Sequence, residues 1–197
     1  GMCVSGVCDL VPERARATLL RSGWRAEEIN EVALFDDAED LIQRGEVEVV
    51  VEATGDPFAG VRHALGCIAA KRHVVMVNVE ADVLAGPLLS RRALEAGTVY
   101  SLAYGDQPAL IVELVDWARI CGFEGVCAGK GTKYLPSYHS STPNTVWQHY
   151  GISPERAACG GMNAKMFNSF IDGTKSAIEM ASVANATGLR PANSGLS

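Results

Sequence analysis

Three short apolar runs in the first half of the chain, at residues 47–52, 73–78 and 99–103, constrain the fold most strongly. The first run is β-branched and too short for a helix, and it stops at Gly55, after which Pro57 suits the first turn of a helix. Near-continuous apolar strands that alternate with helical stretches are typical of a parallel sheet covered by helices on both faces. In such sheets ligands bind beyond the carboxyl ends of the strands, so the loops at those ends are the first place to look for a site.

The same patterning predicts the other elements of the chain. The expected helices are residues 12–21, 37–44, 83–96, 108–120 and one long helix at 166–186, together with a helix that begins at Pro57. The expected further strands are residues 2–9, 32–35 and 124–128, and the segment from 129 to about 161 is expected to be rich in loops.

The chain lacks the motif with which a dinucleotide-binding fold normally opens. That motif is a strand followed by a G-x-G-x-x-G turn, whose backbone binds a pyrophosphate at a helix N-terminus. The nearest match, Gly129-x-Gly131, comes late and has no third glycine. Asp9, in contrast, matches the acidic residue that ends the second strand of such folds and binds the ribose hydroxyls. The sequence therefore predicts an α/β fold with a Rossmann-type parallel sheet that lacks its first βα unit, joined to part of an α+β catalytic domain.

Two domains are expected within the 197 residues. Residues 1–122 are expected to form the NAD(P)-binding domain, incomplete at its N-terminal side, and residues 123–197 part of a catalytic and oligomerisation domain. A homo-oligomer is expected, because an unfinished sheet leaves apolar edges that need to be covered.

Composition narrows the class of protein. The net charge is −6 and the sequence pI is about 5.2, with no basic block, so a nucleic-acid surface is not expected. No apolar run reaches the roughly 20 residues that span a bilayer, so we expect no membrane partner. The first residues lack the order of a signal peptide, and the six cysteines include no C-x-x-C pair, which favours a reduced, cytoplasmic protein. His139 and His149, ten residues apart, fit no zinc pattern, so no metal site is expected.

Several segments resemble one family of oxidoreductases. They are residues 8–15, 50–57, 73–83, 101–109, 129–143 and 160–188, and the run from 104 to 143 is the most specific. This pattern resembles the predicted homoserine dehydrogenase family, whose members carry a SAF-type domain and include deoxyxylulose-phosphate reductoisomerase-like enzymes. Because members of that family are longer at both ends, the resemblance implies that this chain is an internal fragment.

The chain is more distantly similar to authentic homoserine dehydrogenases. Their N-G-T-x-N-Y-I-L stretch is echoed by residues 130–135, and their D-x-x-x-K by Asp172 and Lys175, with a spacing one residue shorter. Two departures argue against homoserine itself as the substrate. Lys130 stands in the place of the asparagine of N-G-T. Those enzymes also carry a lysine after their fifth strand, and this lysine is missing here, since Asn78 is followed by Val79.

The resemblance implies cofactor contacts at three strand ends. Asp9 would accept both ribose hydroxyls and repel a 2′-phosphate, which slightly favours NAD over NADP, although Arg14 and Arg16 lie close enough in sequence to bind that phosphate. The backbone of Ala53, Thr54 and Gly55 would pack near the nicotinamide ribose; otherwise this segment is only a helix entry. Asn78 would lie near the nicotinamide or the substrate; in the alternative reading Asp82 simply starts a helix.

Substrate contacts are expected in the glycine-bracketed loop after residue 128. Lys133 is a candidate catalytic residue, and Lys130 and Thr132 are candidate substrate-binding residues, because paired lysines in such a loop can bind a phosphate or carboxylate or polarise a carbonyl. Both lysines can equally be solvated surface charges. Asp106 is a further candidate for substrate binding, or it starts the helix at Pro108.

The predicted last helix carries Asn168, Asp172, Lys175 and Glu179 at helical spacing, so they are expected to share one face. This stripe is either a solvated row of ion pairs or a polar wall that faces the active site. In the second reading Lys175 transfers the proton of an alcohol or carbonyl, Asp172 orients it, and Glu179 binds substrate.

The predicted function is an NAD(P)-dependent oxidoreductase that acts on a small hydroxy or keto compound, phosphorylated compounds included. One alternative substrate reading is a deoxyxylulose-phosphate reductoisomerase-like activity, which rests on the resemblance. The alternative from another class is a non-catalytic fragment or pseudoenzyme with an assembly or regulatory role, because the chain has no pyrophosphate-binding turn. As an isolated fragment, the chain is expected to be inactive.

Overall fold

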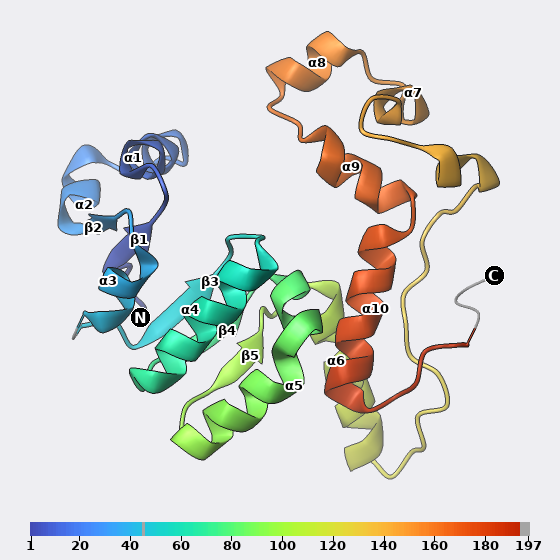
Figure 1. Ribbon diagram of the computed structural model, residues 1–197, viewed down its shortest axis with the longest axis horizontal. Helices are drawn as coiled ribbons and strands as arrows, with labels where there is room; N and C mark the ends of the chain where they lie inside the picture. Colours follow the sequence, from blue (N-terminus) through green and yellow to red (C-terminus); the bar gives the residue numbers. More distant parts are fainter. Residues whose placement is uncertain (45, 194–197) are drawn as a thin grey trace. The chain divides into compact units, whose positions relative to one another are not determined.

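A computed structural model describes residues 1–44 and 46–193 of the chain (Figure 1). The chain divides into two compact units, Gly1–Ala103 and Tyr104–Ser197, which are described separately below as the first and the second unit. All of the strands pair in parallel and helices connect them, so the predicted α/β class with a Rossmann-like parallel sheet is confirmed.

The first unit contains five helices and five short strands in the part that the structure describes. The strands are β1 Gly6–Cys8, β2 Ala33–Phe35, β3 Val49–Glu52, β4 His73–Met76 and β5 Tyr100–Leu102. The helices are α1 Pro12–Arg21, α2 Ala26–Glu31, α3 Ala38–Gln43, α4 Pro57–Ala69 and α5 Val79–Ala96. Among these elements of the first unit, only α2 had no counterpart among those expected from the sequence.

The strands form two separate sheets. In one, β1 pairs with β2, with Gly6 opposite Ala33; in the other, the order is β3-β4-β5, with Val49 opposite His73 and Val74 opposite Tyr100. Each neighbouring pair is parallel, so the intervening helix must return the chain to the starting edge. All carboxyl ends within a sheet therefore lie at one edge.

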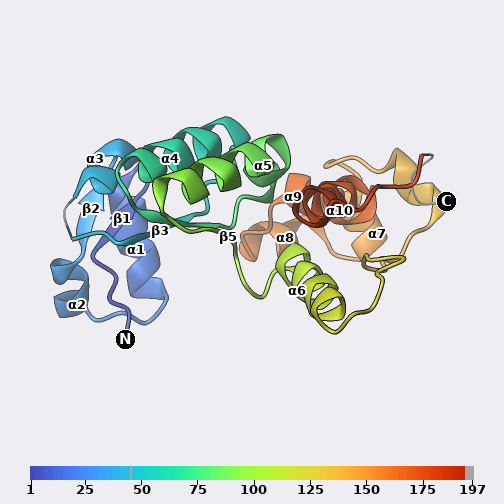
Figure 2. The ribbon, with the colours of Figure 1, turned by 90° about the horizontal axis from the view of Figure 1, so that it is seen from below.

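Helices α4 and α5 cover one face of the three-stranded sheet (Figures 1 and 2). Cys67, Val74, Met76 and Leu89 lie in the core between them and are almost fully buried. The opposite face stays open, since 63% of Val51 is exposed. The expectation that helices cover both faces of this sheet is therefore wrong for the described residues, because α4 and α5 pack on the same side.

Side-chain caps start the two helices of this core. Pro57 is the first residue of α4, and the Asp56 carboxylate accepts a hydrogen bond from the Ala59 N–H. Asn78 caps α5 in the same way by accepting from the Ala81 N–H. This cap starts α5 at Val79, four residues before the predicted start at residue 83.

The second unit is helical in the part that the structure describes. Its elements are α6 Gln107–Ile120, a 3-10 helix η1 Pro136–Ser140, α7 Val146–Tyr150, α8 Pro154–Cys159, α9 Ala164–Ile171 and α10 Thr174–Thr187. The strand expected at 124–128 is absent, because this apolar segment has no partner strand there to pair with. Among the described residues, no helix combines the length and the apolar character that crossing a membrane requires.

The boundary between the units falls earlier than the sequence suggested. We expected it after residue 122, but α6 belongs to the second unit. The reason is packing: α6 lies against α10, and the Arg119 guanidinium donates to the backbone oxygen of Thr187 at 2.8 Å. Helical periodicity within α6 carries no information about which partner it packs on.

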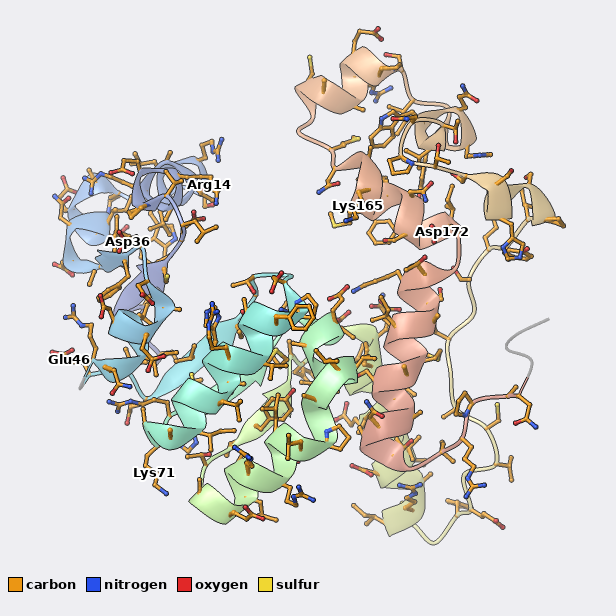
Figure 3. All side chains as sticks on the ribbon, in the orientation of Figure 1. Arg14, Asp36, Glu46, Lys71, Lys165 and Asp172 are labelled. Atoms are coloured by element: carbon orange, nitrogen blue, oxygen red, sulfur yellow. The ribbon has the colours of Figure 1, made fainter. Side chains whose placement is uncertain are left out.

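The long helix expected at 166–186 is broken into α9 and α10. Gly173 has a φ of 89°, a left-handed conformation that ends a helix, and the Asp172 carboxylate accepts from the Thr174 N–H to start the next one. Figure 3 shows Asp172 at this junction. The apolar pattern continues on both sides of the break, so periodicity alone did not reveal it.

Two leucines of α5 test the packing of the first unit. Leu89 is 0% exposed, whereas Leu94 on the same helix is 81% exposed. We expect Leu89→Ala to lower the free energy of unfolding by about 2–5 kcal/mol, because it leaves a cavity. The matched control Leu94→Ala should change it by less than about 0.5 kcal/mol. Urea denaturation of both variants measures this, and equal effects would contradict the described core.

Candidate functional site

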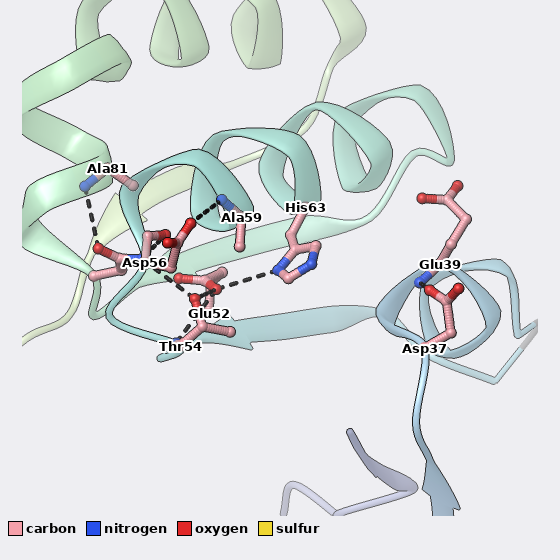
Figure 4. Close-up of polar contacts among 9 residues, drawn as sticks. Asp37, Glu39, Glu52, Thr54, Asp56, Ala59, His63 and Ala81 are labelled. Atoms are coloured by element: carbon pink, nitrogen blue, oxygen red, sulfur yellow. Dashed lines mark hydrogen bonds and ion pairs between the residues drawn. The ribbon is translucent and has the colours of Figure 1, made fainter. Parts of the chain in front are cut away.

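A polar cluster lies at the carboxyl ends of β3 and β4 (Figure 4). Glu52 is the last residue of β3, Thr54 follows it in the loop before α4, and Asn78 follows β4. The carboxyl ends of neighbouring parallel strands meet at one edge of the sheet, where ligands of such folds bind. The structure thus brings together Thr54 and Asn78, two of the predicted cofactor residues.

Glu52 is the buried centre of this cluster, with 3% of the residue exposed. Its Oε1 accepts hydrogen bonds from the Thr54 hydroxyl at 2.6 Å and the Thr54 N–H at 3.3 Å, and lies 3.2 Å from Nδ1 of His63 on α4. Its Oε2 is buried and has no hydrogen-bond partner. Sequence reasoning missed both Glu52 and His63. The available signal was a carboxylate at the end of a run of valines, where the strand is expected to be buried.

Asn78 joins the two strand ends. Its Nδ2 donates to the Asp56 backbone oxygen at 2.8 Å and lies 3.4 Å from the Thr54 hydroxyl oxygen, while its Oδ1 caps α5. The residue is 3% exposed. Asn78 therefore does the capping that the alternative reading gave to Asp82, and it also holds the loop between β3 and α4.

Gly60 allows α4 to approach this cluster closely. A Cβ atom at this position would lie 2.7 Å from the Asn78 Nδ2 and 2.7 Å from the Ala81 Cβ. Cβ atoms essentially never make contacts this short, so only glycine fits without a shift of α4 or α5.

The loop after Glu52 presents its backbone at the surface. Ala53, Thr54 and Gly55 are exposed, Gly55 has a φ of 74°, and open space surrounds the position of a Cβ on it. The left-handed conformation favours glycine and leaves room for a ligand to approach the main chain.

Asp9 follows β1 and therefore belongs to the other sheet of the first unit. Its carboxylate accepts hydrogen bonds from the Val11 N–H at 2.9 Å and from the Arg14 guanidinium, whose Nη2 lies 2.6 Å from Oδ1. The hydrogen bond from Arg14 lowers the pKa of the Asp9 carboxyl, and the bond from Val11 lowers it further. These contacts hold Asp9 ionised at a strand end, and Arg14, labelled in Figure 3, is 61% exposed.

The interior beside the cluster is electrically negative. The Tyr100 hydroxyl on β5 donates to the Asp82 carboxylate at 3.0 Å, and Asp82 is 5% exposed. Burial raises the pKa of Tyr100 well above its ordinary value, and the nearby charges of Asp82 and Glu52 raise it further. Burial likewise raises the pKa of the Cys67 thiol to about 12.

In the second unit, Lys130 forms an ion pair with Glu179 on α10. The Glu179 side chain is 3% exposed and that of Lys130 is 24% exposed. A buried carboxylate needs such a partner, so the two predicted substrate residues already bind each other. Lys133 and Thr132 are exposed in the same segment. Asp106, the last predicted substrate residue, caps α6 by accepting from the Gln107 N–H.

The four polar residues expected on one helix face do not form one stripe. The break at Gly173 separates Asn168 and Asp172 from Lys175 and Glu179, so the prediction of a shared face is wrong. Asn168 is buried, accepts from the Ser141 hydroxyl at 2.7 Å and donates to Asp172 at 2.8 Å. Lys175 lies in the first turn of α10 and is half-buried.

Neither of two shallow hollows in the described part of the chain includes the polar cluster. One is lined by residues that include Trp24 and Glu28, and the other by residues that include Leu65 and Glu95. Among the described residues no group of three or more His, Cys, Asp or Glu side chains is arranged to hold a metal ion.

Parallel strands joined by helices, with capped helix starts at their carboxyl ends, define a Rossmann-type nucleotide-binding unit. Comparison with protein families agrees. Residues 4–98 match the homoserine dehydrogenase NAD-binding domain, and residues 105–197 match the catalytic domain of the oxidoreductase DRL. Both parts of the chain are therefore similar to oxidoreductase domains, the first to one that binds NAD and the second to a catalytic one.

A comparison with solved structures matched part of yvaA from Bacillus subtilis, which is named as an oxidoreductase. The two chains are 20% identical and superpose with a TM-score of 0.42, over 58% of this chain and 31% of the other. This chain thus spans less than a third of the length of yvaA. A comparison with curated proteins found no match.

Two glycines of α4 test the close approach at the cluster. Gly60→Ala should destabilise the first unit by about 1–3 kcal/mol, because the new methyl group collides with Asn78 and Ala81. The control Gly66→Ala places its methyl group 3.1 Å from the exposed Glu39 carboxylate, and it should be neutral or stabilising by up to about 1 kcal/mol. Thermal or urea unfolding compares the two, and a neutral Gly60→Ala would contradict the described packing.

Proposed function

We propose that the protein is an NAD(P)-dependent dehydrogenase or reductase that acts on a small hydroxy or keto compound, phosphorylated compounds included. The observation that carries the proposal is the coincidence of two findings on the first unit. Residues 4–98 match an NAD-binding domain, and the strand ends of the same unit carry a buried, hydrogen-bonded cluster beside an exposed glycine loop.

The residues at the strand ends suit a nicotinamide dinucleotide. Gly55 leaves the backbone open to a ligand, and the hydrogen bond between Asn78 and Thr54 holds the 53–55 loop in place. Asp9, ionised at the end of β1, suits the hydroxyls of a ribose. In this proposal the 53–55 loop contacts the nicotinamide end of the cofactor and Asp9 contacts the adenosine end.

The strand orders of the two sheets suggest that one further strand fits between them. The common Rossmann order is 3-2-1-4-5-6. The described orders, β2-β1 and β3-β4-β5, correspond to 3-2 and 4-5-6, so the position of the central strand lies between β1 and β3. That strand carries the glycine-rich turn for the pyrophosphate. We infer that a βα unit with this turn completes the domain in the active protein.

The choice between NAD and NADP centres on Asp9 and Arg14. The carboxylate alone favours NAD, because it binds ribose hydroxyls and repels a 2′-phosphate. Arg14 forms an exposed ion pair with it and supplies a cation that a 2′-phosphate can bind. The proposal therefore retains both cofactors, with a slight preference for NAD.

A bound nicotinamide supplies the hydride chemistry. The second unit supplies the groups that act on protons and charge in this proposal. Lys175 exchanges the proton of the substrate hydroxyl, since a half-buried ammonium is a suitable general acid. Lys133 is exposed and suits the binding of a substrate carboxylate or phosphate. Asp172 already binds Thr174 and Asn168, and its role is to fix the start of α10, on which Lys175 lies.

Cofactor binding by the 197-residue chain and by a longer protein separates the enzyme from the non-catalytic alternative. We expect the 197-residue chain to bind NADH and NADPH weakly or not at all, because it contains no G-x-G-x-x-G turn. Isothermal titration calorimetry measures this directly. A micromolar dissociation constant for the chain itself would contradict the inferred role of a further βα unit. Absence of binding in a longer protein that contains such a unit would instead favour the assembly role.

The acid–base role of Lys175 can be tested in the active protein. Lys175→Ala should lower kcat by about 10²–10⁴-fold while cofactor affinity stays unchanged, because proton transfer is lost and cofactor contacts are not. The control Lys165→Ala removes an exposed lysine of α9 and should leave kcat unaltered. Steady-state kinetics with a panel of hydroxy acids, aldoses and their phosphates provides the measurement. Normal turnover in Lys175→Ala would remove this residue from the mechanism.

A further inference from the structure

Glu52 and His63 have no assigned role, although they form a largely buried polar contact in the first unit's site. We propose that they are a positioning pair that holds the 53–55 loop in the conformation that binds the cofactor. The inference rests on the proposed function for the identity of the ligand. The contacts that define the pair belong to the structure itself (Figure 4).

The pair anchors the loop from two elements. Glu52 is the last residue of β3 and receives both the hydroxyl and the N–H of Thr54, two residues further on. His63 approaches the same Oε1 from α4, and the two side chains are 2% and 14% exposed. One carboxylate oxygen thus joins the strand, the loop and the helix, so the loop cannot move without breaking a buried, charge-assisted contact.

The same contacts determine what the loop offers to a ligand. The only hydroxyl proton of Thr54 is directed to Glu52, and its oxygen faces the Asn78 amide. The side chain therefore has no proton left to donate outward. The backbone of Ala53, Thr54 and Gly55 remains available, and Gly55 exposes it most fully. The pair turns the loop so that main-chain groups meet the cofactor.

Stability does not account for Glu52. Its Oε2 is buried without a hydrogen-bond partner, and an unsatisfied polar atom of this kind destabilises a fold. An apolar side chain would suit this buried position better. A carboxylate at this position is expected where it fixes a functional loop.

The contact has a spectroscopic signature. An ionised carboxylate accepts hydrogen bonds only, so Nδ1 of His63 carries the proton in this arrangement. A neutral His63 is therefore expected as the Nδ1–H tautomer. Removal of the carboxylate releases this constraint, and the Nε2–H tautomer should then appear.

The first part of the test uses NMR on the 197-residue chain. In the wild type we expect the Nδ1–H tautomer of His63 in ¹⁵N spectra. Glu52→Ala should shift it toward Nε2–H and accelerate hydrogen exchange of the Thr54 amide by about tenfold or more, because the loop loses its anchor. Glu52→Gln keeps the volume and one acceptor oxygen, and it is expected to lie between the two. Should Glu52→Ala fail to fold, Glu52→Gln and His63→Ala decide the matter.

The second part uses the active protein and separates positioning from folding. His63→Ala and Glu52→Ala should raise the KM for the nicotinamide cofactor about tenfold, with kcat within about threefold of the wild type, because the loop must be ordered on binding. His63→Asn, which keeps an N–H donor close to the position of Nδ1, should restore most of the affinity. A purely structural role predicts no such rescue at equal stability.

The outcomes are distinct. The Nε2–H tautomer in the wild type, or an unchanged KM in Glu52→Ala with normal cofactor binding, would overturn the positioning pair alone. An active-length protein that binds neither NAD nor NADP would overturn the proposed function. In that case Glu52 and His63 are no more than an anchor of the fold, whatever the NMR shows.

Discussion

The close packing of α4 on α5 at Gly60 and Ala81 is the contact on which the rest of the site depends. Because no side chain intervenes, Asn78 reaches across from the end of β4 to the backbone of Asp56 and to the hydroxyl of Thr54. The two strand ends are therefore tied by one amide that also caps a helix. A network of this kind acts as a unit, since each hydrogen bond fixes the geometry of the next.

Elements with strong local signals could be predicted from the sequence. The valine-rich β3, the helix with Pro57 in its first turn and the parallel α/β class are all present. Features that depend on partners could not be predicted. The apolar segment at 124–128 has no strand to pair with, and α6 belongs to the second unit because it packs on α10. Gly173 broke a helix whose apolar period continues on both sides.

In the candidate site, too, residues with a local sequence signal could be predicted and residues that depend on distant partners could not. Thr54 and Asn78 could be found because they follow predicted strands, and the structure joins them by a hydrogen bond. Glu52 was missed, since a carboxylate at a strand end usually points to solvent and its partner His63 lies eleven residues later. Lys130 was taken as a substrate residue, yet its partner Glu179 lies 49 residues away in the sequence. Long-range pairs of this kind leave no periodic trace in a single sequence.

The burial of Cys67 makes its thiol a probe of local opening in the first unit. Its thiol lies between α4 and the sheet, and a pKa raised to about 12 leaves almost no reactive thiolate at neutral pH. Cys3, Cys121, Cys127 and Cys159 are exposed, so an alkylating reagent modifies them first. Modification of Cys67 would follow only when α4 separates from the strands, so its rate measures how often α4 opens beside the 53–55 loop.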